Sequence, residues 1–253
     1  MIKVILFGGG NVATHLANEF IQNKEIKLIQ MYNRNISKIK HFKSKTLITN
    51  NLENILDADI YIISISDNAV ADFSSKLILK NKLVVHTSGT ISLNELKSIS
   101  NKGVFYPLQT FSKNKKLQFD NIPICIEAEH EKDLILLKKL ANSITKEYYH
   151  LNSEQRESLH IAAVFVNNFI NHLYHIGHTI CNEANIPFNI LKPLIKETAS
   201  KITTLNPIDA QTGPAVRKDT KTIHKHLEKL SNINQEIYTL LSNSIKNTHG
   251  EKL

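Results

Sequence analysis

The chain has 253 residues, a hydrophobic fraction of 42% and a formal net charge of +8, so it has room for two modest domains or one large one and enough apolar residues for a full core. The lysines are scattered and are not interleaved with aromatic residues as in a stacking platform, which argues against a nucleic-acid partner and leaves a basic surface that favours anionic ligands. Two cysteines are too few for a disulfide framework, and no apolar run approaches the roughly 20 residues of a membrane helix, so we expect a reduced, cytoplasmic protein with no membrane partner.

The N-terminus joins a short apolar strand to a glycine turn and a helix, which is the context of a dinucleotide-binding fingerprint. In that fingerprint Gly8 permits the tight turn, Gly10 lets backbone N–H groups approach a pyrophosphate, and Ala13 permits close packing of helix and strand. Asn11 and Val12 open the helix, whose positive end would hold the pyrophosphate. The alternative is a strand–turn–helix with no ligand.

The second predicted strand, residues 27–32, ends at Asn33 and Arg34. An NAD enzyme usually carries an acidic residue here, which accepts hydrogen bonds from the ribose 2′-OH and would repel a 2′-phosphate. A guanidinium can instead bind a 2′-phosphate through two parallel hydrogen bonds. We therefore expect NADP (NADPH) as the cofactor in preference to NAD, although Arg34 as a surface residue that caps the turn is the alternative.

Strands and helices alternate through the first half of the chain. Further strands are predicted at residues 59–64, 82–86, 103–106 and 122–126, and helices at residues 11–22, 68–79, 93–98 and 131–143. This alternation predicts an α/β domain over residues 1–150, with a doubly wound parallel sheet covered on both faces. Its ligand would bind at the carboxyl ends of the strands.

Two strand ends carry small polar residues that would line the nicotinamide end of the cofactor, at Ser66 and Ser88. Asp67 is interpreted as a helix N-cap. His86 fits a satisfied buried histidine as well as it fits a proton donor.

From Asn152 onward the pattern is almost only helical, which predicts an all-α domain over residues 151–253. Asn152 is the expected N-cap, with Gln155 at the third helical position, of a long helix that ends near Glu183. An apolar seam runs along one face of this helix. Residues 161–166 are apolar on all faces, so we expect that stretch to be buried on every side. The seam would be covered by a second copy in a homodimer or by the domain's own helices.

The same long helix carries a polar stripe roughly opposite the seam. His160 and Asn167 flank the stretch that should be buried, and buried polar groups need partners, which a ligand can supply. Both are therefore candidates to line a catalytic site, and a solvated polar stripe is the alternative. No metal is expected, because His172, His175 and His178 spread around the helix without a carboxylate or cysteine at ligand spacing.

Several segments in this order resemble one group of proteins, the Rossmann-like oxidoreductases with a C-terminal "domain of unknown function 2520". The matching segments are Gly8-Gly9-Gly10-Asn11-Val12-Ala13, His86-Thr87-Ser88-Gly89-Thr90, Tyr106-Pro107-Leu108-Gln109-Thr110-Phe111, His160-Ile161-Ala162-Ala163-Val164-Phe165-Val166-Asn167-Asn168 and Thr212-Gly213-Pro214-Ala215-Val216-Arg217. The group is similar to pyrroline-5-carboxylate reductase, the 6-phosphogluconate dehydrogenase superfamily and F420-dependent NADP oxidoreductases.

The resemblance implies a Rossmann domain, then an all-helical domain that often dimerises, and NADP as cofactor. It implies no substrate. The chain departs from the group at Tyr106, where a histidine is expected before the proline, and at Lys218, where Arg-Gly-Asp is usual.

These residues lead to two hypotheses. In the first, the chain is an NADP-dependent oxidoreductase that transfers hydride between the cofactor and a small, polar, anionic substrate in an interdomain cleft. His160 would then act as general acid or base, and Asn167 would orient the substrate. In the second, the chain binds NADP(H) without catalysis, as a sensor or a regulatory subunit.

Overall fold

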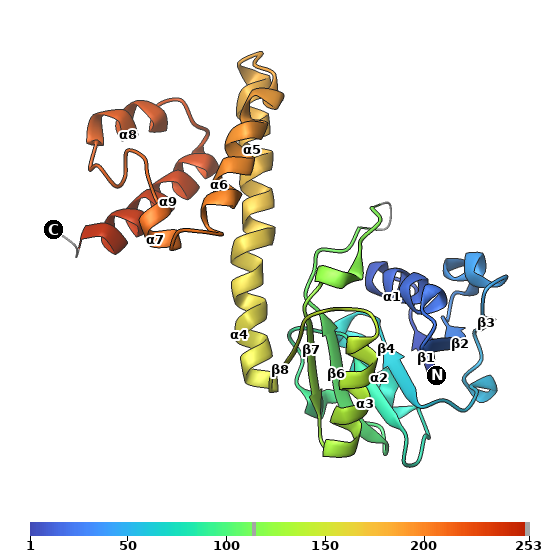
Figure 1. The fold of residues 1–253 in the computed structure, drawn as a ribbon. Coiled ribbons are helices and arrows are strands. Elements are labelled where there is room, and N and C mark those ends of the chain that lie inside the picture. Colours follow the sequence, from blue (N-terminus) through green and yellow to red (C-terminus); the bar gives the residue numbers. More distant parts are fainter. Residues whose placement is uncertain (113–114, 251–253) are drawn as a thin grey trace. The chain divides into compact units, whose positions relative to one another are not determined.

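The computed structural model describes residues 1–112 and 115–250, and the chain divides into two compact units, Met1–Asn167 and Asn168–Leu253 (Figure 1). The first unit is built on an eight-stranded sheet in the order β3-β2-β1-β4-β5-β6-β7-β8. Its strands are β1 (Ile2–Phe7), β2 (Ile26–Tyr32), β3 (Leu47–Thr49), β4 (Ile60–Ile63), β5 (Leu83–His86), β6 (Asn101–Pro107), β7 (Ile124–Ala128) and β8 (Tyr148–His150). The predicted α/β fold is confirmed.

One pair of strands departs from the predicted parallel sheet, because β6 and β7 run antiparallel. Parallel neighbours need a long crossover, which is usually a helix. Between Pro107 and Ile124 the described residues form only one short 3₁₀ turn, Phe119–Asn121, so the chain returns beside β6 in the opposite direction.

Both faces of the sheet are buried, as the sequence predicts for a doubly wound fold. Side chains alternate along β1, so that Val4 and Leu6 pack in one core and Ile5 and Phe7 pack in the other. The first core includes side chains from α1 (Asn11–Gln22) and α3 (Glu131–Asn142), and the second includes Val70 of α2 (Val70–Ser75).

Two helices of this unit are shorter than predicted. The helix expected at residues 68–79 ends at Ser75, because the hydroxyls of Ser74 and Ser75 donate to carbonyls three residues back and compete with the helix. The helix expected at residues 93–98 is a single 3₁₀ turn, Leu93–Glu95, after which Leu96 is extended and buried in the core.

The long helix begins and ends where the sequence predicts. It comprises α4 (Ser153–Ala163), a six-residue π-helical segment, Val164–Phe169, and α5 (Ile170–Glu183). Asn152 accepts a hydrogen bond from the backbone of Gln155 at 2.8 Å, and the Gln155 side chain accepts one from the backbone of Asn152 at 3.0 Å. This capping box confirms the predicted start. The spacing of apolar residues in the sequence gives no sign of the π-helical segment.

The expected burial of residues 161–166 on every side is wrong for the single chain. The side chains of Ile161, Phe165 and Val166 are 55%, 61% and 72% exposed. Arg156, in the first half of α4, is the buried residue of this helix, so the apolar residues that follow extend beyond the contact with the sheet. An apolar run shows that burial is favourable, but it does not say what covers it.

The second unit is helical throughout, as predicted. After α5 it contains α6 (Lys192–Lys201), α7 (Pro207–Ala210), α8 (Thr220–Leu227) and α9 (Asn232–Gly250). Large apolar side chains remain exposed on it, among them Ile190, Leu194 and Leu240. Within the described residues, none of the helices has the length and apolar character to cross a membrane.

Candidate cofactor and active site

The glycine turn lies at the point where the strand order reverses. β1 pairs with β2 on one side and with β4 on the other. The strands β2 and β3 thus extend the sheet on one side of β1, and β4 and the later strands extend it on the other side. The register aligns Phe7 with Ile63, and Ile63 with His86. The segments that follow these three residues therefore share one edge of the sheet, which is where open α/β sheets bind ligands.

Gly8 has a backbone conformation that requires glycine. Its φ is +139°, and a Cβ built on it would lie 2.0 Å from the carbonyl oxygen of Ser64 and 3.3 Å from the Cβ of Ala13. The turn, the end of β4 and α1 therefore approach each other too closely for any side chain at this position. These are the tight turn and close packing that the fingerprint predicts.

Gly10 and the first turn of α1 form an open cradle suited to an anion. A Cβ on Gly10 would meet no described atom within 4 Å, and Gly10 gives α1 no side-chain cap. The first turn of α1, which contains Asn11 and Val12, holds no acidic residue. The Asn11 amide donates to the carbonyl of Phe111 at 2.8 Å and ties the turn to the segment after β6. Unsatisfied N–H groups and the helix dipole suit a pyrophosphate here.

Asn33 and Arg34 follow β2 at the same edge. Asn33 is half-buried, and its amide nitrogen would lie 2.8 Å from a Cβ on Gly9. Its side-chain oxygen accepts from the backbone of Asn35 at 2.9 Å, which fixes the turn. The Arg34 guanidinium is exposed and has no hydrogen-bond or ion-pair partner within residues 1–112 and 115–250.

The two serines predicted near the nicotinamide differ in their surroundings. Ser66 is exposed and is itself the N-cap of the 3₁₀ turn Asp67–Ala69, so the interpretation of Asp67 as the cap is wrong. The Asp67 carboxylate instead accepts from the hydroxyls of Ser88 and Thr90, at 2.9 and 2.6 Å. Ser88 is buried, and its hydroxyl also accepts from the backbone of Thr90. Ser88 thus holds the loop after β5 in shape.

His86 is a buried histidine, but it is not fully satisfied, because its Nε2 has no hydrogen-bond partner among the described residues. It is fully buried at the end of β5, and its Nδ1 accepts the backbone N–H of Ser88 at 3.1 Å. Burial, together with the positive charge of Arg156, lowers its pKa to about 3. A histidine that stays neutral at physiological pH is a poor proton donor.

His160 meets Tyr106 beside the same loop. The Tyr106 hydroxyl lies 3.2 Å from Nδ1 of His160, and the two rings meet edge to face at 6.2 Å between centroids. A Cβ on Gly89 would lie 2.7 Å from both His160 Nδ1 and Tyr106 Cζ, so the two rings leave no room for a side chain at this position. Burial raises the pKa of Tyr106 to about 12. A hydroxyl and an imidazole thus share one contact at the sheet edge.

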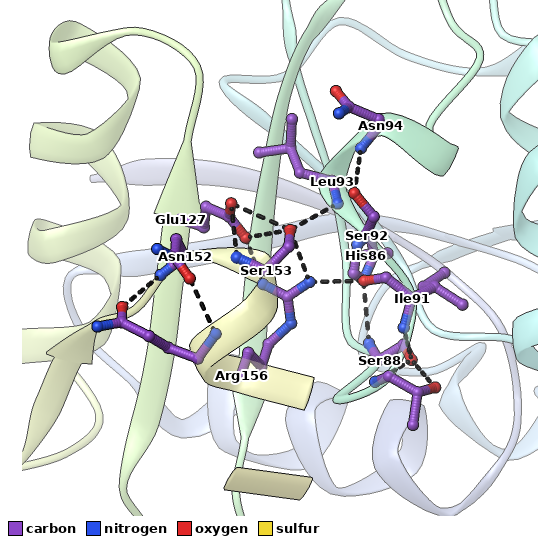
Figure 2. Close-up of polar contacts among 12 residues, drawn as sticks. His86, Ser88, Ile91, Ser92, Leu93, Asn94, Glu127, Asn152, Ser153 and Arg156 are labelled. Carbon is purple, nitrogen blue, oxygen red and sulfur yellow. Dashed lines mark hydrogen bonds and ion pairs between the residues drawn. The ribbon is translucent and has the colours of Figure 1, made fainter. Parts of the chain in front are cut away.

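A buried arginine, which sequence reasoning missed, fixes the helix that carries His160. Figure 2 shows Arg156 between Glu127 on β7 and Ile91 in the loop after β5. Its guanidinium forms an ion pair with the Glu127 carboxylate and donates to the Ile91 carbonyl at 2.6 Å. Ser153 adds two hydrogen bonds from its backbone and hydroxyl to Glu127, at 3.0 and 2.9 Å. The available signal was the spacing of Arg156 and His160, four residues apart and so on one helix face.

The structure places Asn167 in the exposed π-helical segment that follows α4. π turns occur frequently at functional sites. His160, by contrast, is half-buried.

Comparisons with known proteins agree with this geometry. Residues 3–89 match a family described as NADP oxidoreductase, coenzyme F420-dependent, and residues 122–245 match the domain of unknown function DUF2520. A search of the curated proteins found no match.

Solved structures extend the likeness over almost the whole chain. A protein from Bacteroides fragilis, described as a candidate NADP oxidoreductase, is 38% identical, with 97% of this chain and 98% of that chain covered and a TM-score of 0.89. A reductive aminase from Aspergillus terreus in complex with NADPH and ethyl-5-oxohexanoate is 15% identical, with 99% and 94% covered and a TM-score of 0.69. An imine reductase from Myxococcus stipitatus in complex with NADP+ is 13% identical, with 98% and 93% covered and a TM-score of 0.64. The similarity to the reductive aminase and to the imine reductase shows the fold alone.

The 38% identity over nearly both full lengths carries the assignment, and the two matched domains agree with it. The chain belongs to the family of NADP-dependent oxidoreductases that join an F420-dependent type of NADP oxidoreductase domain to a DUF2520 domain.

Proposed function

We propose that this chain uses NADPH to reduce a carbonyl or imine group of a small, polar, anionic substrate. The observation that carries the proposal is a shared edge of the sheet. The glycine turn follows β1, Gly89 follows β5 and Tyr106 lies near the end of β6, and β1, β4, β5 and β6 are parallel neighbours in register. A dinucleotide cradle and the Tyr106–His160 pair thus lie along one ligand-binding edge.

The residues that would hold the cofactor follow from the cradle. Gly8, Gly10, Asn11, Val12 and Ala13 would receive the pyrophosphate at the start of α1. The open space at Gly10 and the absence of an acidic residue from the first turn of α1 support this fit. When bound, the cofactor supplies a hydride.

Arg34, with Asn33 beside it, would bind the 2′-phosphate that distinguishes NADP from NAD. The support is an exposed guanidinium that makes no ion pair with any described residue, directly after the strand that neighbours the glycine turn. Ser66 and Ser88 would lie near the nicotinamide end, and Ser88 would also maintain the loop that carries Gly89.

His160 would supply the proton, and Asn167 would orient the substrate. Histidine is the side chain whose protonation ordinarily changes near neutral pH, and His160 is half-buried beside the edge of the sheet. The anionic character of the substrate is supported by the net charge of +8, which attracts anions.

A second copy of the chain would cover the exposed apolar face of the helical unit and form a homodimer. The support is the set of large apolar side chains left in solvent there, among them Ile190, Leu194 and Leu240. We further propose the division of roles that the composition suggests, with residues 1–150 for the cofactor and residues 151–253 for substrate and dimerisation. Sedimentation equilibrium should show a dimer. A monomer at micromolar concentration would contradict the proposed homodimer.

The test of the proposed reaction is a screen of NADPH oxidation, followed by its absorbance, with small oxo acids, other carbonyl compounds and imines. With a substrate in hand, His160→Ala should lower kcat by about 10²–10⁴-fold, the usual contribution of a proton-transferring side chain. Asn167→Ala should raise KM or lower kcat. His150→Ala, a change at an exposed histidine on β8, is the matched control and should leave both constants unchanged.

Wild-type kinetics in both His160→Ala and Asn167→Ala would contradict the assigned roles. NADPH binding without turnover of any compound in the screen would contradict the reaction itself and would describe a nucleotide-binding protein.

A further inference from the structure

We infer that Tyr106 is the positioning residue of His160: its hydroxyl holds Nδ1, so Nε2 is the nitrogen that gives the proton to the substrate. The inference rests on the proposed function, because it assigns an orientation to the histidine of that site. The observation behind it is the 3.2 Å contact between the Tyr106 hydroxyl and His160 Nδ1.

Both rings are attached to backbone that is held in place. Tyr106 lies on β6, an inner strand paired with β5 and β7. His160 lies one helical turn beyond Arg156, whose guanidinium is bonded to Glu127 and to the Ile91 carbonyl. Gly89 lies beside both rings, because a Cβ built on it would be 2.7 Å from His160 Nδ1 and from Tyr106 Cζ. The contact is therefore set by three elements of the fold.

The charge state of Tyr106 suits a positioning role. Burial raises its pKa to about 12, so the hydroxyl stays protonated and neutral at physiological pH. A phenolate at this place would form an ion pair with a protonated His160, and the imidazolium would then keep its proton instead of giving it to the substrate. A neutral hydroxyl can accept a hydrogen bond from Nδ1–H and can also donate one to an unprotonated Nδ1. The hydroxyl therefore orients the His160 ring whether the imidazole is protonated or neutral, and it forms no ion pair that would stabilise the imidazolium charge.

The proton balance then assigns each nitrogen. With His160 protonated, Nδ1–H donates to the Tyr106 oxygen and Nε2–H faces the substrate. Bound NADPH would supply a hydride to the carbon of the carbonyl or imine, and the electron pair of the double bond would move to its oxygen or nitrogen. That atom takes the proton from Nε2, and His160 remains neutral with its proton on Nδ1.

Tyr106→Phe tests this arrangement, because it removes the hydroxyl and keeps the ring. The matched control is Tyr149→Phe, which removes an exposed hydroxyl on β8 that donates to Glu147. We expect Tyr106→Phe to lower kcat by about 10–100-fold, the scale of a misplaced catalytic group, with KM and NADPH affinity within about twofold of wild type. The solvent deuterium isotope effect on kcat should rise, because proton transfer becomes slower. Tyr149→Phe should change none of these.

A second readout does not depend on turnover. In ¹⁵N spectra of the full-length protein, the Nδ1 resonance of His160 should move in Tyr106→Phe and stay in Tyr149→Phe, because the hydroxyl is its hydrogen-bond partner. If Tyr106→Phe does not fold, Gly89→Ala replaces it, since its Cβ would force the two rings apart while the hydroxyl remains.

Unchanged kcat and an unchanged Nδ1 resonance in Tyr106→Phe would overturn the inference. A moved resonance with unchanged kcat would also overturn it, since the contact would then have no role in the reaction. A moved resonance in a protein that reduces no compound would show that the proposed function has failed and that the contact is structural.

Discussion

Replacement of Arg156 by methionine should destabilise the sheet unit more than any surface change. The arginine side chain is 1% exposed, and its partner Glu127 is 15% exposed. Methionine fills most of the volume but cannot pair with the carboxylate or with the Ile91 carbonyl. Two donors of Ser153 remain on Glu127, and they are uncharged. Removal of one partner from a buried pair costs about 3–5 kcal/mol, because the other charge stays buried without compensation.

The free energy of unfolding should be measured by urea denaturation at pH 7, with three variants beside wild type. Arg156→Met should lose about 3–5 kcal/mol. The double variant Arg156→Met/Glu127→Met should recover much of that loss, because an apolar pair leaves no buried charge. Lys76→Met, which breaks an exposed ion pair with Asp72, should change stability by less than about 1 kcal/mol.

A loss below about 1 kcal/mol in Arg156→Met, on the scale of a surface change, would refute the reasoning. A double variant no more stable than the single one would refute it as well, since the penalty would then not come from the charge left on Glu127. The same variant should lower the activity of His160, because Arg156 fixes the helix that carries it.

Three further changes test separate parts of the site. Gly8→Ala should abolish NADPH binding in calorimetry, because its Cβ would lie 2.0 Å from the Ser64 carbonyl oxygen; wild-type affinity would show that the turn does not hold the cofactor. Gly89→Ala should cost about 1–3 kcal/mol in urea denaturation as an overpacked site, and an unchanged midpoint would mean that Tyr106 and His160 move freely. His86→Asn should weaken the pH dependence of stability. The pKa of His86 is about 3 in the folded chain, whereas its ordinary value is 6.5. Below pH 6.5 the unfolded state therefore binds a proton that the folded state does not, and the stability decreases as the pH decreases. At pH 5 this loss is about 2 kcal/mol in wild type and absent in the variant, whereas the exposed-site control His150→Asn should keep it.

Local features of this chain were predictable from sequence because neighbouring residues determine them. The strand, the turn at Gly8 and the helix from Asn11 to Gln22 follow from a short apolar run, from a backbone that requires glycine and from the helical pattern after it. The capping box at Asn152 is likewise a pattern of four residues. By contrast, β3 and β8 have three residues each at the edges of the sheet, too few for a period to show.

The centre of the candidate site depends on residues far apart in sequence, and so it was only partly predictable. His160 was identified by its place on the helix, but its partner Tyr106 lies 54 residues away. The pairing of Arg156 with Glu127 joins a helix to a strand whose antiparallel direction was not predicted. Asp67 bonds to the loop after β5, so a local reading as a helix cap could not find its role.

The most direct test of the account is calorimetric titration of the purified protein with NADPH and, separately, with NADH. We predict that NADPH binds with a Kd of about 1 μM, at least about tenfold tighter than NADH, and that Arg34→Ala removes the difference while NADH affinity stays the same. Binding of neither nucleotide would contradict the central claim, because the glycine turn and the whole edge of the sheet would then serve another purpose.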